Sequence, residues 1–303
     1  MDKKLRPSVF KRALALLIDY MILGIIGLIL GLFFEDFFVS MGKYGTLIGT
    51  VIAISYFSIF QSKIGDGQSL GKMAINSKVT DLNGEYLSFN KSFLRAFILV
   101  FPIMNIEFLA SGKGMIVMMS IVSLLMLASM YLVIVNKSRR CLHDLIIPSV
   151  VVYQSVSSIE LEESNDRTYI KIIPLSILVA LGLGMGLYQT FVATELSPLL
   201  SAKDKIENQE GVIGVNRIES SVTTNYTTNS PNNTFSSIAV TVRIDDMIEA
   251  SDVDSDYFGT VHDIIKEEVP EYKNADVILI TLYYGYNIGI ANKTRSVSNR
   301  FTN

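Results

Sequence analysis

Residues 13–33 read ALALLIDYMILGIIGLILGLF, a run of 21 residues in which Asp19 is the only charged side chain. A helix of this length is about 30 Å long, which matches the hydrocarbon core of a bilayer. The run is too long for the apolar part of a signal peptide, and no small-residue cleavage pattern follows it. We therefore expect a helix that remains in the membrane as an anchor.

The composition of the whole chain agrees with a membrane protein. Hydrophobic residues make up 50% of the 303 residues, and charged residues make up only 18%, against about 25% in soluble domains. The single cysteine, Cys141, excludes an intramolecular disulfide, and no His/Cys pattern has the spacing of a zinc site. Residues 195–303 carry 16 acidic and 9 basic side chains, so they repel phosphates. We expect no metal, no cofactor and no nucleic-acid partner.

Four further apolar segments predict additional spans, at residues 45–60, 96–110, 115–135 and 172–192. Segment 96–110 is short and contains Pro102, so a re-entrant helix is the alternative there. If all five segments cross, 15 basic residues of the short loops are cytoplasmic and two are outside, as the positive-inside rule requires. This predicts a multi-pass protein of the cell membrane with a cytoplasmic N-terminus.

The predicted fold is a helical transmembrane bundle of about five spans with a C-terminal soluble α+β extracytoplasmic domain. Its parts are a transmembrane domain at 1–153, a cytoplasmic linker at 154–171, an additional helix at 172–192 and the outer domain at 195–303. In the outer domain, apolar patterning predicts two helices and four strands. The helices are expected at 199–208 and 257–268, and the strands at 212–224, 236–244, 275–284 and 287–297.

Ionisable residues near the membrane are the candidates for function. Arg12 and Asp19 lie seven residues apart, on nearly the same helix face. A charge at this depth costs several kcal/mol unless it pairs or faces water, so Asp19 either pairs with Arg12 or a neighbouring helix for assembly, or moves an ion or proton. After the fourth segment, Arg140, His143 and Asp144 form a charged cluster, and Asp144 is placed to pair with Arg12 or Arg95.

The loop between the second and third segments contains Gly67, Gly71 and Lys72. A phosphate-binding loop would need Gly at position 66 and Ser or Thr at position 73, where Asp66 and Met73 stand. The loop therefore does not predict a nucleotide site.

The same loop contains the pair Asn83–Gly84 between two segments of alternating apolar residues. Asn-Gly in this setting is a strong signal for a two-residue β-hairpin turn. We expect the strand-like run that ends at Asp81 to form a hairpin there.

The order of these features resembles the RDD family of membrane proteins, named for one arginine and two aspartates. The features in chain order are Arg12 and Asp19, the Gly67–Lys72 loop, the Asn83–Gly84 turn, Arg95, the group Arg140, Leu142, His143 and Asp144, and the run Val150–Val152. The resemblance covers about residues 6–153. It implies that the family's arginine corresponds to Arg12 and its aspartates to Asp19 and Asp144. It also implies an integral membrane protein suspected of transport, with cation/proton exchange proposed for some members.

Two functions are consistent with these observations. The first is a transporter or cation/proton exchanger that uses Arg12, Asp19 and Asp144, and that would need to form a homo-oligomer because it has few spans. Residues expected to support it are Arg95, Arg140, His143, Gly67, Gly71 and Lys72. The second is a membrane-anchored sensing, binding or assembly protein whose outer domain meets an extracytoplasmic protein or ligand.

An enzyme is not expected. The predicted topology places the two histidines, His143 and His262, on opposite sides of the bilayer. No Ser/His/Asp or Cys/His nucleophile system can then be assembled on either side.

Overall fold

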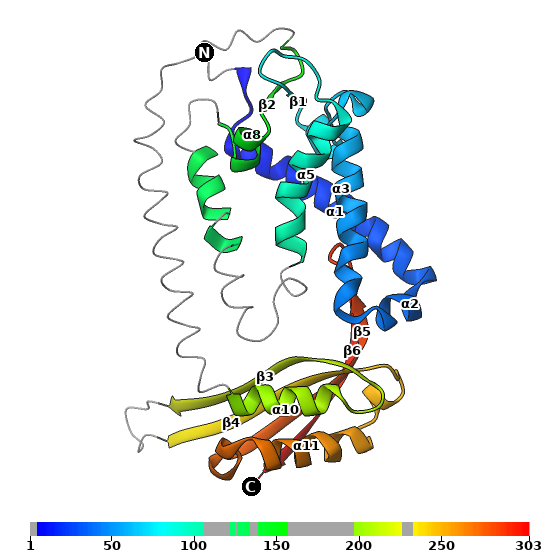
Figure 1. The fold of residues 1–303 in the computed structure, drawn as a ribbon, viewed down its shortest axis with the longest axis vertical. Coiled ribbons are helices and arrows are strands. Elements are labelled where there is room, and N and C mark those ends of the chain that lie inside the picture. The colour runs from blue at the N-terminus through cyan, green and yellow to red at the C-terminus, as the bar shows by residue number, and fades with distance from the viewer. Residues whose placement is uncertain are drawn as a thin grey trace. The chain divides into compact units, whose positions relative to one another are not determined.

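The computed structural model describes residues 5–105, 122–124, 126–133, 139–156, 197–225 and 233–302. The chain forms two compact units, drawn in Figure 1. The first, here called the helical unit, contains the described residues of Met1–Leu30, Thr46–Phe191 and Ile288–Ala291. The second, the sheet unit, contains those of Gly31–Gly45, Val192–Asn287 and Asn292–Asn303.

The helical unit is built on three long helices. They are α1 (Val9–Phe33), α3 (Gly45–Phe60) and α5 (Phe89–Met104), joined by shorter elements. The shorter elements are η3 (Lys63–Gly65), α4 (Leu70–Ala74), α8 (Leu142–Ile146) and a helical stretch at Val122–Val133. Two stretches, Val9–Phe33 and Gly42–Phe60, are long and apolar enough to cross a membrane.

The predicted spans agree with these helices to different degrees. The second, 45–60, coincides with α3. The third, 96–110, overlaps α5, but that helix begins earlier, at Phe89 after the cap residue Ser88, and ends at Met104. Of the fourth, 115–135, the described residues are helical. The fifth, 172–192, lies outside the described residues.

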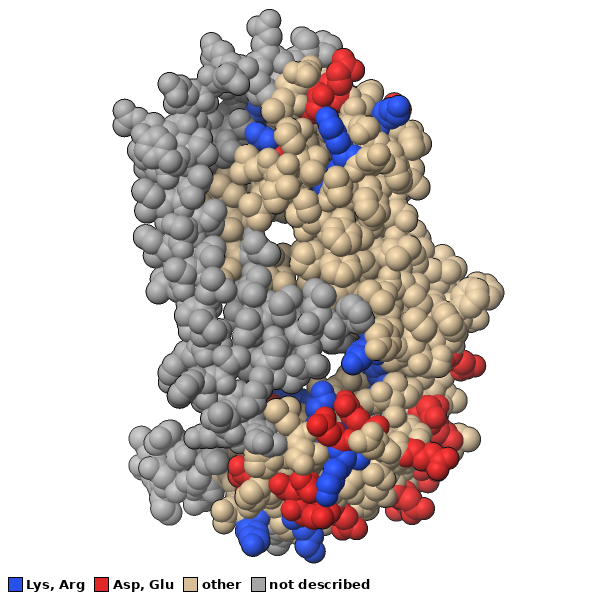
Figure 2. Space-filling model, viewed as in Figure 1, with Lys and Arg blue, Asp and Glu red and all other residues tan. Residues whose placement is uncertain are grey.

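The outer surface of α1 is suited to lipid. Leu17, Met21, Leu28 and Leu32 are each more than half exposed, and a contiguous exposed apolar face of this kind is rare on a soluble monomer. On the face of the helical unit seen in Figure 2, the charged side chains gather at the end that carries β1 and β2 (Figure 1), and the surface beyond them is uncharged. The helical unit therefore has one polar end and an apolar flank.

A two-stranded sheet closes the polar end of the helical unit. Strand β1 (Ser77–Thr80) pairs antiparallel with β2 (Val150–Tyr153), in register from Ser77↔Tyr153 to Thr80↔Val150. The expected turn is present, because the Asp81 N–H donates to the Glu85 carbonyl at 2.8 Å. The expected hairpin pairing is wrong. The chain enters α5 directly after the turn, so the apolar and largely buried β2 supplies the partner for β1.

Residues Ile288–Ala291 also belong to the helical unit. Ile290 packs against the core cluster that contains Leu23 and Ala53. A Cβ at Gly49 of α3 would lie 1.8 Å from the Ile288 carbonyl oxygen, so only glycine permits this close approach.

The sheet unit is a four-stranded sheet with helices. Its strand order is β3-β4-β5-β6, with β4 and β5 parallel and the two outer pairs antiparallel. The strands are β3 (Val212–Asn225), β4 (Asn233–Ile244), β5 (Val277–Asn287) and β6 (Asn292–Thr302). The helical elements are α2 (Glu35–Ser40), η2 (Gly42–Tyr44), α10 (Ser197–Glu207), η5 (Glu249–Ser251), α11 (Asp256–Glu268) and η6 (Pro270–Asn274).

The sequence predicted the elements of this unit closely. Both expected helices and all four expected strands are present. The final hairpin turns later than expected, because β5 continues to Asn287 with Tyr284 and Tyr286 buried. The main connection between the parallel strands contains α11, whose buried Phe258 and Ile265 contribute to the core of the unit.

The sheet unit also includes a segment from far earlier in the chain. Helix α2 lies against β5, where the Tyr284 hydroxyl donates to Asp36 Oδ1 at 2.9 Å. Lys293 forms an ion pair with Glu35. The predicted outer domain at 195–303 did not include this contribution from Gly31–Gly45.

Candidate functional site

The fully buried carboxylate of Asp144 is bound on both oxygens. Oδ2 accepts a hydrogen bond from Nη2 of Arg12 at 3.0 Å and from the Cys141 N–H at 3.1 Å. Oδ1 accepts from Nε of Arg95 at 2.9 Å and from the Ser149 hydroxyl at 3.0 Å. Asp144 therefore joins α1, α5 and α8 at the polar end of the helical unit.

The electrostatics keep this carboxylate ionised. Burial alone would raise the pKa of Asp144, but the positive charges of Arg95 and Arg12 hold it well below its ordinary value. A buried charge pair of this kind is costly to break, because each partner left behind would be an uncompensated ion. The sequence-based expectation that Asp144 could pair with Arg12 or Arg95 is confirmed for both arginines.

Arg95 connects three parts of the unit. Besides Asp144, its guanidinium donates to the side-chain oxygen of Gln61, at the end of α3, and lies 3.2 Å from Nε2 of His143. Burial lowers the pKa of His143 to about 3, so the ring is neutral at physiological pH. Nε2 then accepts the hydrogen bond from Arg95, and His143 is not an ion-pair partner of Asp144.

Arg140 and Arg139 hold the chain around α8. The Arg140 guanidinium donates to the carbonyl oxygens of Asp144, at 2.6 Å, and of Ser149. Arg139 donates to the Pro7 carbonyl at 3.0 Å, and Arg12 donates to the Arg139 carbonyl. These bonds fix the segment before α1 against the segment before α8.

Asp19 has a separate set of partners and is also fully buried. Its carboxylate accepts hydrogen bonds from the Tyr56 hydroxyl at 2.7 Å, the Ser69 hydroxyl at 2.6 Å and the Gly71 N–H at 2.7 Å. Of the two expected structural partners of Asp19, Arg12 is wrong, because it pairs with Asp144 among the described residues, and a neighbouring helix is confirmed by the bonds from Tyr56 of α3 and Gly71 of α4. A seven-residue spacing defines the helix face but not which neighbours approach it.

The two glycines singled out in the loop allow close contacts. A Cβ at Gly71 would lie 1.9 Å from the Ala15 carbonyl oxygen of α1. Gly67 has φ +68, and a Cβ there would lie 2.4 Å from the Val79 carbonyl oxygen. Both positions therefore require glycine: Gly71 allows α4 to lie directly against α1, and Gly67 allows the loop to lie against β1.

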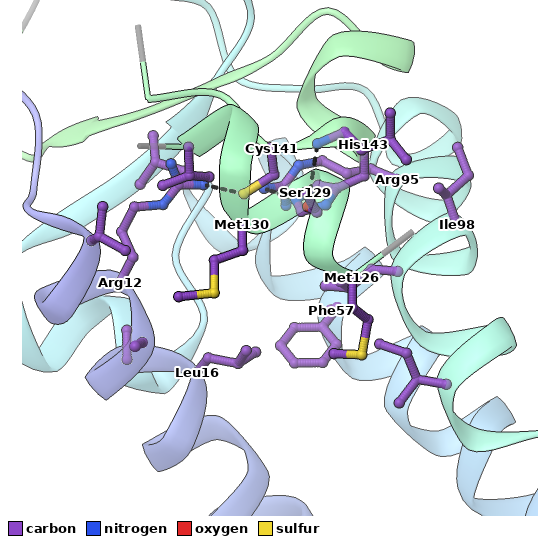
Figure 3. Close-up of a pocket in the computed structure, with 18 of the residues that line it drawn as sticks. Arg12, Leu16, Phe57, Arg95, Ile98, Met126, Ser129, Met130, Cys141 and His143 are labelled. Atoms are coloured by element: carbon purple, nitrogen blue, oxygen red, sulfur yellow. Dashed lines mark hydrogen bonds between the residues drawn. The ribbon is translucent and has the colours of Figure 1, made fainter. Parts of the chain in front are cut away.

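A cavity of about 300 Å3 lies beside the Asp144 cluster. Its polar side includes Arg12, Arg95, Lys72, Cys141 and His143, and its other side is mainly apolar. Figure 3 shows this division, with Arg12, Cys141, His143 and Arg95 at one end and Leu16, Phe57 and Met126 at the other. Neither Asp19 nor Asp144 is among the described residues that line it.

Lys72 is the cation of this cavity that has no fixed partner. No hydrogen bond or ion pair joins its ammonium group to any described residue, and the side chain is half-buried. Burial lowers its pKa to about 7, together with the charges of Arg95 and Arg12, while Asp19 and Asp144 act in the opposite direction.

Residues 6–147 match the sequence model of the RDD family. This part of the chain is an RDD domain. The RDD family is a membrane family, so the apolar flank of the helical unit belongs in a bilayer. No curated protein and no solved structure matches the chain significantly.

The potential ligand atoms of Cys141, His143 and Asp144 in the RDD domain lie within 4.8 Å of one another. Asp144 already binds two guanidinium groups, and these cations would repel a metal ion at the same position. The geometry therefore does not favour a metal site there.

Sequence reasoning missed several polar partners in the RDD domain. Tyr56 and Gln61 lie in or next to an apolar helix, where a hydroxyl or amide must find a partner, and this was the signal available for them. Ser149 and Arg139 are close in sequence to Asp144, but only the fold shows what they bind.

Proposed function

We propose that this protein is a multi-span carrier of the cell membrane and that the cavity in its RDD domain is the solute site. The observation that supports this most is the cavity itself, bordered at one end by Arg12, Lys72 and Arg95. Ionisable side chains inside a membrane domain are costly, and they usually mark solute or ion pathways. A cavity with few convergent polar groups and an otherwise apolar lining is the common form of a small-molecule site.

In this proposal the RDD residues have different roles. Arg12 and Arg95 present positive charge to the cavity, and Asp144 holds them in place. Proton exchange by Asp19 with Arg12, the expectation from the sequence, is less well supported. Asp19 is occupied by three donors and is not among the described residues that line the cavity. We assign Asp19 the role of positioning α3 and α4 against α1.

The contacts support a five-span topology by parity. β1 pairs with β2, so the loop after α3 and the segment after the fourth predicted span lie on one side. α2, directly after α1, contacts β5, so the C-terminal domain lies on the side reached by the first span. An odd number of crossings must then separate β2 from the C-terminal domain. Together with the charge asymmetry of the loops, these contacts support our proposal that the N-terminus is cytoplasmic and the C-terminal domain is outside.

The proposal is tested with purified full-length protein in liposomes that contain a pH-reporting dye. Concentration jumps of Na+, K+, inorganic phosphate or decane-1-sulfonate are applied while current and lumenal pH are recorded. We expect a response to at least one probe, and we expect Ile98→Trp, which fills the cavity, to remove it. The matched control is Phe97→Trp, because Phe97 is exposed on the same helix. Equal responses in both variants, or none to any probe in the wild type, would overturn the proposal.

A further inference from the structure

The polar end of the cavity has more positive than negative charge. Three cations, Arg12, Arg95 and Lys72, line it, and two carboxylates, Asp144 and Asp19, lie behind them. Asp144 is bound by both arginines, and Asp19 is bound by hydroxyl and backbone donors. With Lys72 protonated, these three cations and two carboxylates carry one net positive charge, and Lys72 is the cation that has no hydrogen bond or ion pair from its ammonium group to a described residue.

The excess positive charge at the polar end of the cavity favours an anionic ligand. A cation placed here would be repelled by two permanently charged guanidinium groups. A carboxylate or phosphate group could instead accept hydrogen bonds from the Lys72 ammonium and from guanidinium N–H groups that face the cavity. His143 and Cys141 add no negative charge, because His143 is neutral and burial raises the pKa of the Cys141 thiol.

The apolar end of the cavity favours a ligand that has an aliphatic chain. Residues from α1, α3, α5 and the stretch at Val122–Val133 surround it; they include Leu16, Phe57, Ile98, Met126 and Met130. The methionines are flexible and adapt to an aliphatic chain. A volume of about 300 Å3 is at the lower end of small-molecule pockets, and it suits one chain of moderate length rather than a two-chain lipid.

We propose that the cavity binds an anionic single-chain amphiphile, with its carboxylate or phosphate group between Arg12, Lys72 and Arg95 and its chain between Leu16, Phe57, Ile98 and Met130. The inference rests on the proposed function, since it names the class of solute for the same cavity. The expectation from the sequence was exchange of a cation; the solute that we propose for this RDD domain is an organic anion.

The test is a binding measurement by titration calorimetry on the full-length protein in a non-ionic detergent. Decanoate and decyl phosphate carry the two head groups, decanol and decyltrimethylammonium remove or reverse the charge, and inorganic phosphate removes the chain. Both anionic amphiphiles should bind at least tenfold more tightly than the other three probes. Comparison of decanoate with decyl phosphate identifies the preferred head group. If inorganic phosphate binds as well as decyl phosphate, or decanol as well as decanoate, the proposal is wrong.

Two pairs of variants locate the site. Lys72→Gln should weaken decanoate binding roughly tenfold, whereas Lys91→Gln, an exposed lysine four residues before Arg95, should not. Ile98→Trp should abolish binding of the chain, whereas Phe97→Trp should not. Thermal unfolding of each variant shows whether the fold is retained. Equal affinities for Lys72→Gln, Ile98→Trp and their controls would place the amphiphile elsewhere and overturn the inference.

The binding experiment tests the ligand class and the flux experiment tests the carrier function, so either proposal can be wrong while the other holds. If the amphiphiles bind as expected but no probe is transported, the ligand class holds and the carrier function fails. If flux of another probe depends on Ile98 while no amphiphile binds, the carrier function holds and the ligand class fails.

Discussion

Nε of Arg95 donates to Oδ1 of Asp144 at 2.9 Å, across 49 residues of sequence. This bond, together with that from Arg12, makes one carboxylate the common partner of two cations from two different helices. The positions of both guanidinium groups at the edge of the cavity therefore depend on Asp144, although this residue does not face the cavity.

Asp144→Ala should destabilise the RDD domain strongly. It leaves Arg12 and Arg95 without their buried counter-ion, and breaking a buried ion pair in this way costs about 3–5 kcal/mol. Chemical unfolding of the full chain in detergent micelles measures the loss. Glu85→Gln, at an exposed acidic residue, is the control and should change stability by less than about 0.5 kcal/mol. Similar effects of the two substitutions would contradict the assignment.

Asp19→Asn and Asp19→Ala should differ in stability. An amide can still accept from Gly71 and Tyr56 and donate to the Ser69 oxygen, so we expect a loss of about 1–2 kcal/mol for asparagine. Alanine leaves three buried donors without an acceptor, and we expect about 3 kcal/mol or more. If Asp19 only positions the helices, flux by Asp19→Asn stays near the wild-type level. A stable Asp19→Asn protein without flux would restore Asp19 as a direct participant in transport.

Gly71→Ala should disrupt the contact between α4 and α1. The added Cβ would lie 1.9 Å from the Ala15 carbonyl oxygen, and neither backbone can move without shifting Asp19 and Tyr56. We expect a lower melting temperature and weaker decanoate binding. The same substitution at Gly259, the fourth residue of α11, where a Cβ meets nothing within 4 Å, should stabilise the protein by about 0.5–1 kcal/mol.

Ligand binding should weaken as the pH rises through and above about 7. The pKa of Lys72 is lowered to about 7, so its ammonium is charged below this pH and neutral above it, while Arg12 and Arg95 stay charged throughout. The carboxylates of Asp19 and Asp144 oppose this shift, and a bound anion moves the transition upward. Decane-1-sulfonate, which does not titrate, is the probe. In Lys72→Arg the affinity should be independent of pH between 6 and 9, and a persistent pH dependence there would assign the effect to another group.

The five-span topology that we propose predicts the compartment of each loop. Reporter proteins active only in the cytoplasm should function when inserted at Lys78 or Arg140. Reporters active only outside should function when inserted at Lys43 or fused after Asn303. A cytoplasmic signal after Asn303 together with an outside signal at Lys43 would contradict the contact between α2 and β5.

The sequence predicted those parts of the fold that are determined locally. The bounds of α3 and most elements of the sheet unit follow from apolar periodicity and turn residues within one segment. The pairing of β1 with β2 could not be derived in this way, because an Asn-Gly turn indicates only a reversal of the chain and not the partner of the strand before it.

The candidate site shows the same distinction. Asp144 was a plausible partner for both arginines because a charged residue next to the membrane must be compensated. The partners of Asp19 are two hydroxyls and a backbone N–H, which carry no charge and no distinctive spacing. In the sequence, Lys72 belonged to a failed phosphate-loop pattern and to the loop that resembles the RDD family, so it was a supporting residue and not the cation of a cavity. Its place at the cavity depends on the contact of Gly71 with α1, which only the fold shows.

The position of Asp144 in the chain has a consequence for biosynthesis. Arg12 and Arg95 are translated 132 and 49 residues before their shared counter-ion, and β1 likewise precedes its partner strand. Until α8 and β2 leave the ribosome, Arg12 and Arg95 lack the carboxylate that pairs with both of them. The Asp144 cluster and the two-stranded sheet of the RDD domain can therefore form only after residues 144–153 have been translated.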